Sequence, residues 1–274
     1  MNNFRRILQD AKVEKYGIGA FDVFNYETVN AVLKAAKDAE SPVIIMYPEV
    51  MTGYMPLRAF VDMTRSLSAF WNVDSAIIMD HGFHYENVVQ AIDAGFDAVM
   101  FDGSSLPYDD NLRLTKEVVR RAQASGVAVE AELGHVGEGN SYDIDNYAYT
   151  DVNLALDFIE KTNIDALAVA IGTAHGNYSG TPKLNFELLK DIRSKVEIPL
   201  VLHGGSSTGD ENIKMAISGG IQKVNIYTEM ATAAVERMKP SFIGNENGLF
   251  EMLNALNEGF YEAAYKNIKL FKNK

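Results

Sequence analysis

The chain alternates between short apolar runs and longer amphipathic stretches along nearly its whole length. Each apolar run has the length of a strand, is rich in Val, Ile and Ala, and is followed by a polar turn. Runs without a polar alternation are typical of parallel strands that helices cover on both faces. Eight strands are predicted, over residues 16–21, 43–47, 76–79, 97–101, 127–131, 166–171, 199–202 and 223–226.

The stretches between these runs carry apolar residues at helical spacing, which predicts amphipathic helices. They cover residues 27–39, 87–94, 111–125, 152–161, 186–196 and 211–218, and the segment 229–274 predicts two or more closing helices around Pro240. Eight strand–helix units indicate a (β/α)₈ TIM barrel with extra C-terminal helices, of the α/β class. No Pro-, Ser- or Gly-rich linker divides the chain, so we predict a single domain over residues 1–274. A doubly wound open sheet is the alternative, and it is disfavoured because no Gly-x-Gly-x-x-Gly follows the first strand.

Composition limits the classes of partner. Of 274 residues, 25 are Lys or Arg and 37 are Asp or Glu, so the net charge is −12, which disfavours nucleic acid as a partner. No apolar run approaches the roughly 20 residues that cross a bilayer, and polar residues interrupt the stretch behind Arg5 and Arg6, against a signal peptide. The absence of Cys excludes thiolate chemistry and suits a reducing compartment. We therefore expect a cytoplasmic protein without membrane contact.

Three of the five histidines lie where predicted strands end. His81 follows the third strand, His175 the sixth and His203 the seventh. The carboxyl ends of barrel strands meet at one face, where the chemistry of such barrels takes place. Three imidazoles with an open position are the usual ligands of a catalytic zinc ion, although Co²⁺ and Fe²⁺ suit them too. Three histidines at one face therefore predict a metal site, whereas His84 and His135 are interpreted as surface or loop residues.

Acidic residues stand beside these histidines. Asp80 precedes His81 and is interpreted either as a carboxylate that orients this ligand or as a general acid/base acting on a substrate hydroxyl. Asp102 and Glu132 end the fourth and fifth strands and could form a second cation position, or they are charges satisfied by water or by Lys and Arg.

The turns after the seventh and eighth strands suit a phosphate group. Gly204-Gly205-Ser206-Ser207 and Asn225-Ile226-Tyr227-Thr228 follow these two strands. Barrel proteins often hold phosphate between these loops, where glycine admits the anion to backbone N–H groups and hydroxyls add donors. Beside a metal ligand, these turns predict a phosphate-binding site.

Six motifs in order resemble those of the class II, metal-dependent ketose-bisphosphate aldolases, the family of fructose- and tagatose-bisphosphate aldolases. The resemblance spans residues 1–270. The motifs are Asp80-His81-Gly82, Phe101-Asp102-Gly103-Ser104, Glu132-Leu133-Gly134, Gly172-Thr173-Ala174-His175-Gly176, His203-Gly204-Gly205-Ser206-Ser207 and Val224-Asn225-Ile226-Tyr227-Thr228.

The resemblance implies a zinc-dependent lyase that cleaves or forms a phosphorylated ketose from dihydroxyacetone phosphate and an aldehyde, through a metal-stabilised enediolate. It implies that His81, His175 and His203 hold zinc, that Asp80 moves a proton, and that Asp102 and Glu132 match a second metal position. The dihydroxyacetone-phosphate half would contact Gly176, Gly204, Gly205, Ser206, Asn225, Ile226, Tyr227 and Thr228, often beside a monovalent cation. A homo-oligomer, dimer or tetramer, is also implied.

Three other activities remain as alternatives. A lysine Schiff base is disfavoured because Lys223 is placed at the start of its strand, away from the catalytic end. A metal-dependent hydrolase would want a His-x-His pair after the first strand, where the chain has Asp22-Val23-Phe24. A sugar-phosphate-binding barrel without turnover is the third.

The chain departs from the family pattern in three places. Relatives carry Asn-x-Asn-Asn after the first strand and Gln-x-Ser after the second, where this chain has Asp22-Val23-Phe24-Asn25 and Met46-Tyr47-Pro48-Glu49. After the fifth strand a Glu of the relatives moves the C3 proton, and a simple alignment places Asn140 there, with Glu138 and Asp143 nearby. These segments would contact the aldehyde half, so we expect an aldehyde other than glyceraldehyde 3-phosphate.

Overall fold

Eight parallel strands form a closed barrel in the computed structural model, which describes residues 2–141, 143–178, 182–242 and 248–272. The strands pair in chain order, and the eighth closes on the first. They are β1 (Ile18–Asp22), β2 (Val43–Pro48), β3 (Ser75–Gly82), β4 (Ala98–Phe101), β5 (Ala128–Leu133), β6 (Ala166–Val169), β7 (Leu200–Leu202) and β8 (Ile221–Ile226). The predicted TIM barrel is confirmed.

Two strands differ from their predicted bounds in a way that matters for the site. β3 continues to Gly82, so Asp80 and His81 belong to the strand rather than to the turn after it. β8 begins at Ile221, which places Lys223 inside the strand and not at its start. In both cases polar side chains interrupt the apolar run, so the pattern of apolar residues alone does not show the full length of the strand.

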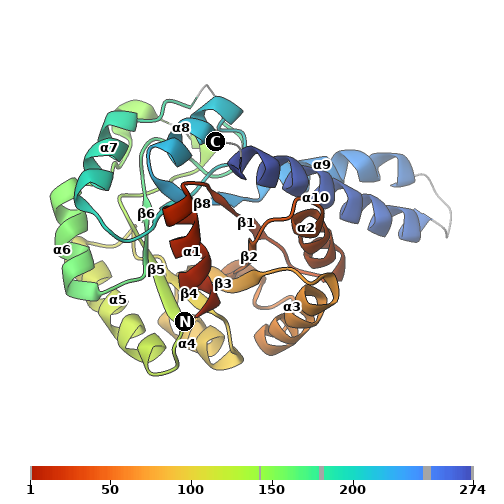
Figure 1. The fold of residues 1–274 in the computed structure, drawn as a ribbon, viewed down its shortest axis with the longest axis horizontal. Coiled ribbons are helices and arrows are strands. Elements are labelled where there is room, and N and C mark those ends of the chain that lie inside the picture. The colour runs from red at the N-terminus through yellow and green to blue at the C-terminus, as the bar shows by residue number, and fades with distance from the viewer. Residues whose placement is uncertain (1, 142, 179–181, 243–247, 273–274) are drawn as a thin grey trace.

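Helices surround the barrel (Figure 1). They are α1 (Asn3–Glu14), α2 (Tyr26–Asp38), α3 (Leu57–Trp71), α4 (Tyr85–Ala94), α5 (Tyr108–Gln123), α6 (Val152–Thr162), α7 (Phe186–Lys195), α8 (Asp210–Ser218), α9 (Thr228–Met238) and α10 (Gly248–Lys272), with short 3₁₀ turns η1 (Glu49–Met51), η2 (Gly139–Ser141), η3 (Ile144–Asn146) and η4 (Lys239–Phe242). In the part of the chain that the structure describes, no helix combines the length and the apolar character needed to cross a bilayer.

Helices α1 and α3 lie outside the stretches predicted to be helical. Helix α1 buries Phe4, Ile7, Leu8 and Ala11, and the side chain of Asn2 accepts hydrogen bonds from the first turn. This spacing and this N-cap are a recognisable helix signal that a search for strand–helix units passes over, because α1 precedes the first strand.

Two apolar layers hold the barrel together. The outer layer lies between strands and helices, where branched side chains such as Val99 and Ile45 pack against helix residues such as Val118. The inner layer fills the barrel itself and is rich in alanine, as at Ala98 and Ala128. Side chains alternate between these layers along each strand, and small inward residues leave room for long polar side chains nearer the mouth.

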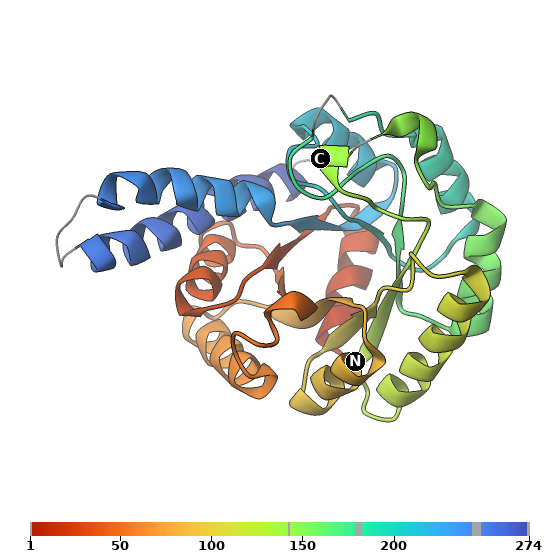
Figure 2. The same ribbon diagram turned by 180° about the vertical axis from the view of Figure 1, so that it is seen from behind.

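Helix α1 lies across one opening of the barrel, as Figure 1 shows from the front and Figure 2 from behind. It contributes Phe4 and Leu8 to the inner layer. The Arg5 guanidinium donates to Asp165 at 2.6 and 2.9 Å and to the carbonyl of Val127 at 3.1 Å, close to where β6 and β5 begin. Helix α1 thus closes the N-terminal end, and the site lies at the other end.

Helices α9 and α10 run side by side away from the barrel as an arm (Figures 1 and 2). Arg237 of α9 forms ion pairs with Glu258 and Glu262 of α10. This arm corresponds to the predicted closing helices, with the short turn η4 carrying Pro240.

Candidate active site

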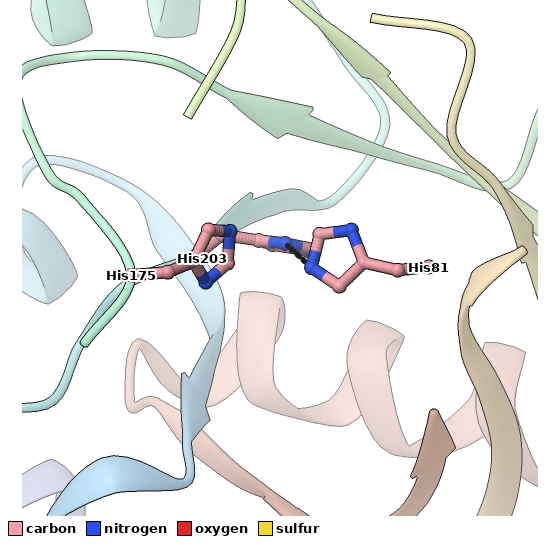
Figure 3. Close-up of side chains that lie close together, drawn as sticks. All are labelled: His81, His175 and His203. Atoms are coloured by element: carbon pink, nitrogen blue, oxygen red, sulfur yellow. Dashed lines mark hydrogen bonds between the residues drawn. The ribbon is translucent and has the colours of Figure 1, made fainter. Parts of the chain in front are cut away.

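The structure brings His81, His175 and His203 together at the carboxyl-terminal end of the barrel (Figure 3). One ring nitrogen of each lies within 4.8 Å of those of the other two. His81 Nε2 and His203 Nδ1 are 3.0 Å apart, and the His81 and His175 ring centroids are separated by 4.9 Å. Three imidazoles that converge in this way can hold one metal ion.

The strands fix where each imidazole points. His81 is the seventh residue of β3 and has φ 45°, a left-handed conformation that a non-glycine residue adopts only where its surroundings enforce it. His203 directly follows β7 and is fully buried. His175 lies in the loop after β6, where its backbone N–H donates to the carbonyl of Gly137 at 2.8 Å.

Carboxylates hold the outer nitrogens of two of these rings. Asp102 Oδ2 lies 2.7 Å from His81 Nδ1, and Glu130 Oε1 lies 3.0 Å from His203 Nε2. Each carboxylate leaves the opposite ring nitrogen facing the other histidines. A carboxylate behind a histidine is the usual device that fixes the ring and its tautomer at a metal site.

The charges of the cluster also suit a cation. Burial lowers the pKa of His175 and of His203 well below the usual range, and the charge of His81 adds to the effect, so these two rings are neutral. Burial lowers the pKa of His81 too, but the carboxylates of Asp80 and Asp102 outweigh it and raise this pKa to about 10. The acids around His81 therefore favour a positive charge at this position, which a bound cation would supply in place of the proton.

Glu132 faces the same cluster. Its Oε2 atom is buried without a hydrogen-bond partner and lies 3.6 Å from His203 Nδ1. Burial, and then the charge of Asp102, raise the pKa of Glu132 to about 8. His81, Asp102 and Glu132 form a second group whose ligand atoms lie within 4.8 Å of one another.

Asp80 lies at the centre of the site and is 2% exposed. Its Oδ2 atom is 3.6 Å from His81 Nε2, and its Oδ1 atom accepts a hydrogen bond from Asn225 Nδ2 at 3.1 Å. Asn225 thus connects β8 with β3 and fixes the carboxylate beside the histidines. The structure therefore brings the predicted acid/base together with the predicted metal ligands.

A buried ion pair lies beneath the cluster, and the sequence analysis did not identify it as part of the site. Lys223 Nζ is 2.9 Å from Glu130, and both side chains are fully buried. Glu130 and Glu132 are two residues apart on β5, so both point into the barrel. The spacing of two residues between Glu130 and Glu132 could have indicated that both face the barrel interior. Glu130, however, lies in the middle of β5 and not at its end, where site residues were sought.

Replacing Lys223 by Met should lower the free energy of unfolding by about 3–5 kcal/mol, because Glu130 would keep a buried charge without its partner. Met has a similar length, so little volume changes. Urea denaturation measures the effect, and Lys214→Met is the control because Lys214 pairs with Glu211 on the surface. Equal stability of Lys223→Met and the unchanged protein would contradict a charged pair at this position.

A cavity of about 850 Å³ opens above the cluster. The residues predicted to bind substrate that line it are Gly176, Gly204, Ser206, Asn225, Ile226, Tyr227 and Thr228. Gly205 is not among the lining residues, and its N–H donates to the carbonyl of Asn225 at 3.1 Å. Gly204 has φ 66°, and a Cβ atom there would lie 2.3 Å from the carbonyl oxygen of Ala174, so only glycine fits this turn.

The loop after β5 places one of its three candidate residues in the cavity. Glu138 lines the cavity, and its backbone forms a bridge with that of His175. All three residues are exposed to solvent, but Asn140 and Asp143 do not line the cavity. The residue that a simple alignment places at the proton-moving position is therefore not the one that faces the site.

The two remaining histidines differ in their surroundings. The His84 side chain is 73% exposed and its Nδ1 lies 2.8 Å from Glu49, as suits a surface residue. His135 also lies in a loop, but it lines the cavity, with Nδ1 2.9 Å from the Ser104 hydroxyl. His135 was interpreted from the sequence only as a surface or loop residue, and its position at the cavity was not predicted.

Comparisons with known proteins show the family to which the chain belongs. The family model of class-II fructose-bisphosphate aldolase matches residues 2–274, and the chain belongs to this family of metal-dependent TIM-barrel aldolases, which are lyases. Escherichia coli (strain K12) YdjI is 39% identical over 264 residues, which cover 96% of this chain and 94% of YdjI.

Solved structures show the same fold. The crystal structure of the YdjI aldolase from Escherichia coli K12 matches with a TM-score of 0.87 and 37% identity, covering 98% of this chain and 96% of that one. A structure solved as a candidate fructose-1,6-bisphosphate aldolase from Coccidioides immitis matches with a TM-score of 0.90 and 27% identity, with the same coverage of 98% and 96%.

Proposed function

We propose that this protein is a zinc-dependent class II aldolase that cleaves and forms a phosphorylated ketose, with dihydroxyacetone phosphate and an aldehyde as the products of cleavage. The observation that carries the proposal is the convergence of His81, His175 and His203 beside the buried carboxylate of Asp80. A cytoplasmic location and a dimer or tetramer stay predictions.

The residues present fit a divalent cation. His175 and His203 are neutral, as ligands must be, and His81 would release its proton when a cation binds. Asp102 and Glu130 hold the outer nitrogens of His81 and His203. When bound, zinc supplies a Lewis acid that stabilises the negative charge left on the ketose after C–C cleavage, as an enediolate. Glu132, with its unpartnered buried oxygen, and Asp102 are the residues that could hold a second cation.

Asp80 is the proton carrier at the C4 oxygen. In cleavage its carboxylate accepts the proton of the C4 hydroxyl, the C3–C4 bond breaks, the electron pair remains on the C3 side, and the aldehyde leaves. In condensation the same group returns the proton to the aldehyde oxygen. Asn225 keeps one oxygen of Asp80 engaged, which leaves the other directed at the histidine cluster.

Glu138 is the residue placed to move the proton at C3. Of the three acidic or amide residues considered in the β5 loop, it is the one that lines the cavity. Its Oε2 atom lies 3.9 Å from the Cβ position of Gly176, where the dihydroxyacetone-phosphate half is proposed to bind. An exposed Asn140 therefore gives no reason to infer a barrel without turnover.

The phosphate of that half suits the loops after β7 and β8. The Ser206 hydroxyl accepts from the backbone N–H groups of Tyr227 and Glu229 at 3.3 Å, which ties the first turn of α9 to the β7 loop. An anion there meets the positive end of the α9 dipole. Gly204, whose backbone packs against that of Ala174, lines the cavity beside this position.

Removal of the metal is expected to abolish turnover. Dialysis against a chelator should stop hydrogen exchange at C3 of dihydroxyacetone phosphate in D₂O, followed by NMR, and added Zn²⁺ should restore it. Exchange that persists after metal removal would favour a different carbanion sink. Exchange that is absent in the zinc-loaded protein would contradict the aldolase proposal and favour a binding barrel, and release of phosphate without exchange would favour a hydrolase.

A further inference from the structure

The cavity has two sides, and the closed strand order separates them. Strands β6, β7 and β8 carry the loops assigned above to the phosphate end, and β2 and β3 lie across the barrel from β6 and β7. A ketose phosphate whose phosphate lies at the first side, with its C3–C4 bond beside Asp80, extends its remaining carbons toward the β2 and β3 loops. This inference rests on the proposed function.

The second side is walled by apolar and acidic side chains. The apolar ones are Pro48, Val50, Met51, Phe83 and Val136. The carboxylates along the cavity are those of Asp22, Glu49, Asp80 and Glu138, and among the described residues none of the lining side chains is Lys or Arg.

Glu49 occupies hydrogen-bond donors on this side of the cavity. Its carboxylate accepts hydrogen bonds from the N–H groups of Phe83 and His84, and from Asn87. These bonds use the donors at the start of the β3–α4 loop, which would otherwise be available to an anion. The Glu49 carboxylate itself is 5% exposed and fixes Phe83 beside His81, with ring centroids 5.9 Å apart.

Asp22 offers a group that a hydroxylated ligand can use. It lines the cavity at the end of β1, between the two sides, and its Oδ1 atom is buried with no hydrogen-bond partner. A buried acceptor without a donor costs free energy that a ligand hydroxyl can recover. A phosphate in its dianionic form has no such donor.

We infer that the aldehyde half of the substrate is an uncharged hydroxyaldehyde, so that the ketose carries one phosphate only, at the end held by the β6, β7 and β8 loops. A second phosphate would lose its hydration among apolar and acidic groups, without a Lys or Arg side chain to compensate it. Asp22 accepts a hydrogen bond from a hydroxyl group of the incoming aldehyde.

Condensation with matched aldehyde pairs tests this inference. The zinc-loaded protein is given dihydroxyacetone phosphate with glyceraldehyde or glyceraldehyde 3-phosphate, and with erythrose or erythrose 4-phosphate. The neutral member of each pair should have a kcat/KM at least about tenfold higher. Equal or greater use of the phosphorylated members would overturn the inference, including the case in which a second copy of the chain supplies the cation.

A gain of charge gives a second, independent measurement. Val50 is 77% exposed at the cavity, so Val50→Arg should fold and add a cation to this wall. It should reduce the preference for neutral aldehydes by about tenfold, whereas Val13→Arg, on the exposed face of α1 at the other end of the barrel, should leave the preference unchanged. An unchanged preference in Val50→Arg would overturn the assignment of this wall.

Hydrogen exchange at C3 of dihydroxyacetone phosphate, measured without any aldehyde, distinguishes a failure of this inference from a failure of the proposed aldolase function. Exchange with a preference for phosphorylated aldehydes overturns this inference alone. No exchange and no condensation with any aldehyde overturns the proposed function, and this inference with it.

Discussion

His175→Ala should lose its metal and its aldolase activity together. The two remaining imidazoles, His81 and His203, would offer too few ligands to retain a catalytic zinc ion. Removing a residue that only hydrogen-bonds to a metal ligand lowers activity by up to about 100-fold. Because His175 is itself a proposed ligand, we expect a larger loss of activity. Metal analysis of the purified variant, beside the kcat of the same sample, measures both effects.

His135→Ala is the matched control for the metal content. Its imidazole lines the same cavity but does not belong to the converging group. It should retain one equivalent of metal. Stoichiometric metal in His175→Ala, at the level of this control, would show that the ion does not lie among the three histidines.

Asp80→Asn should keep the metal and lose rate. An amide of nearly the same shape cannot accept the proton of the C4 hydroxyl, so kcat should fall by about 10²–10⁴-fold. Asn225 can still form a hydrogen bond to the new side chain, so the fold around the site should persist. Retro-aldol assays and metal analysis on one preparation distinguish a lost proton carrier from a lost ligand.

Hydrogen exchange at C3 gives this variant an internal control. The proton at C3 is assigned to Glu138, which Asp80→Asn leaves in place, so exchange should continue while C–C cleavage fails. A rate of cleavage like that of the unchanged protein would reduce Asp80 to a group that orients His81.

The sequence could predict the barrel and the residues at its mouth because their pattern is local. Each strand is a short apolar run, and His81, His175 and His203 stand directly at or after strand ends, where the geometry of the barrel brings them together. Nothing more than strand order is needed to infer that these three side chains share one face.

Residues deeper in the barrel could not be predicted in this way. Glu130 and Lys223 interrupt apolar strands, and their partners are distant along the chain, so only the folded register places Nζ on the carboxylate. The same holds for the β5 loop, where a count along the sequence favours Asn140, but Glu138, whose backbone bridges to that of His175, is the residue that lines the cavity.

Helix α1 has a consequence for the order in which the chain can complete its fold. Its residues are synthesised before every strand of the barrel, but Asn2 bonds the carbonyl of Asp97, and Arg5 bonds Val127 and Asp165, which lie 95, 122 and 160 residues away along the chain. Until β6 has been synthesised, α1 lacks its anchors, and the apolar interior of the barrel stays uncovered at that end. Helix α1, although it precedes β1 in the sequence, is therefore among the last elements to dock, and its slow, non-local closure completes the barrel.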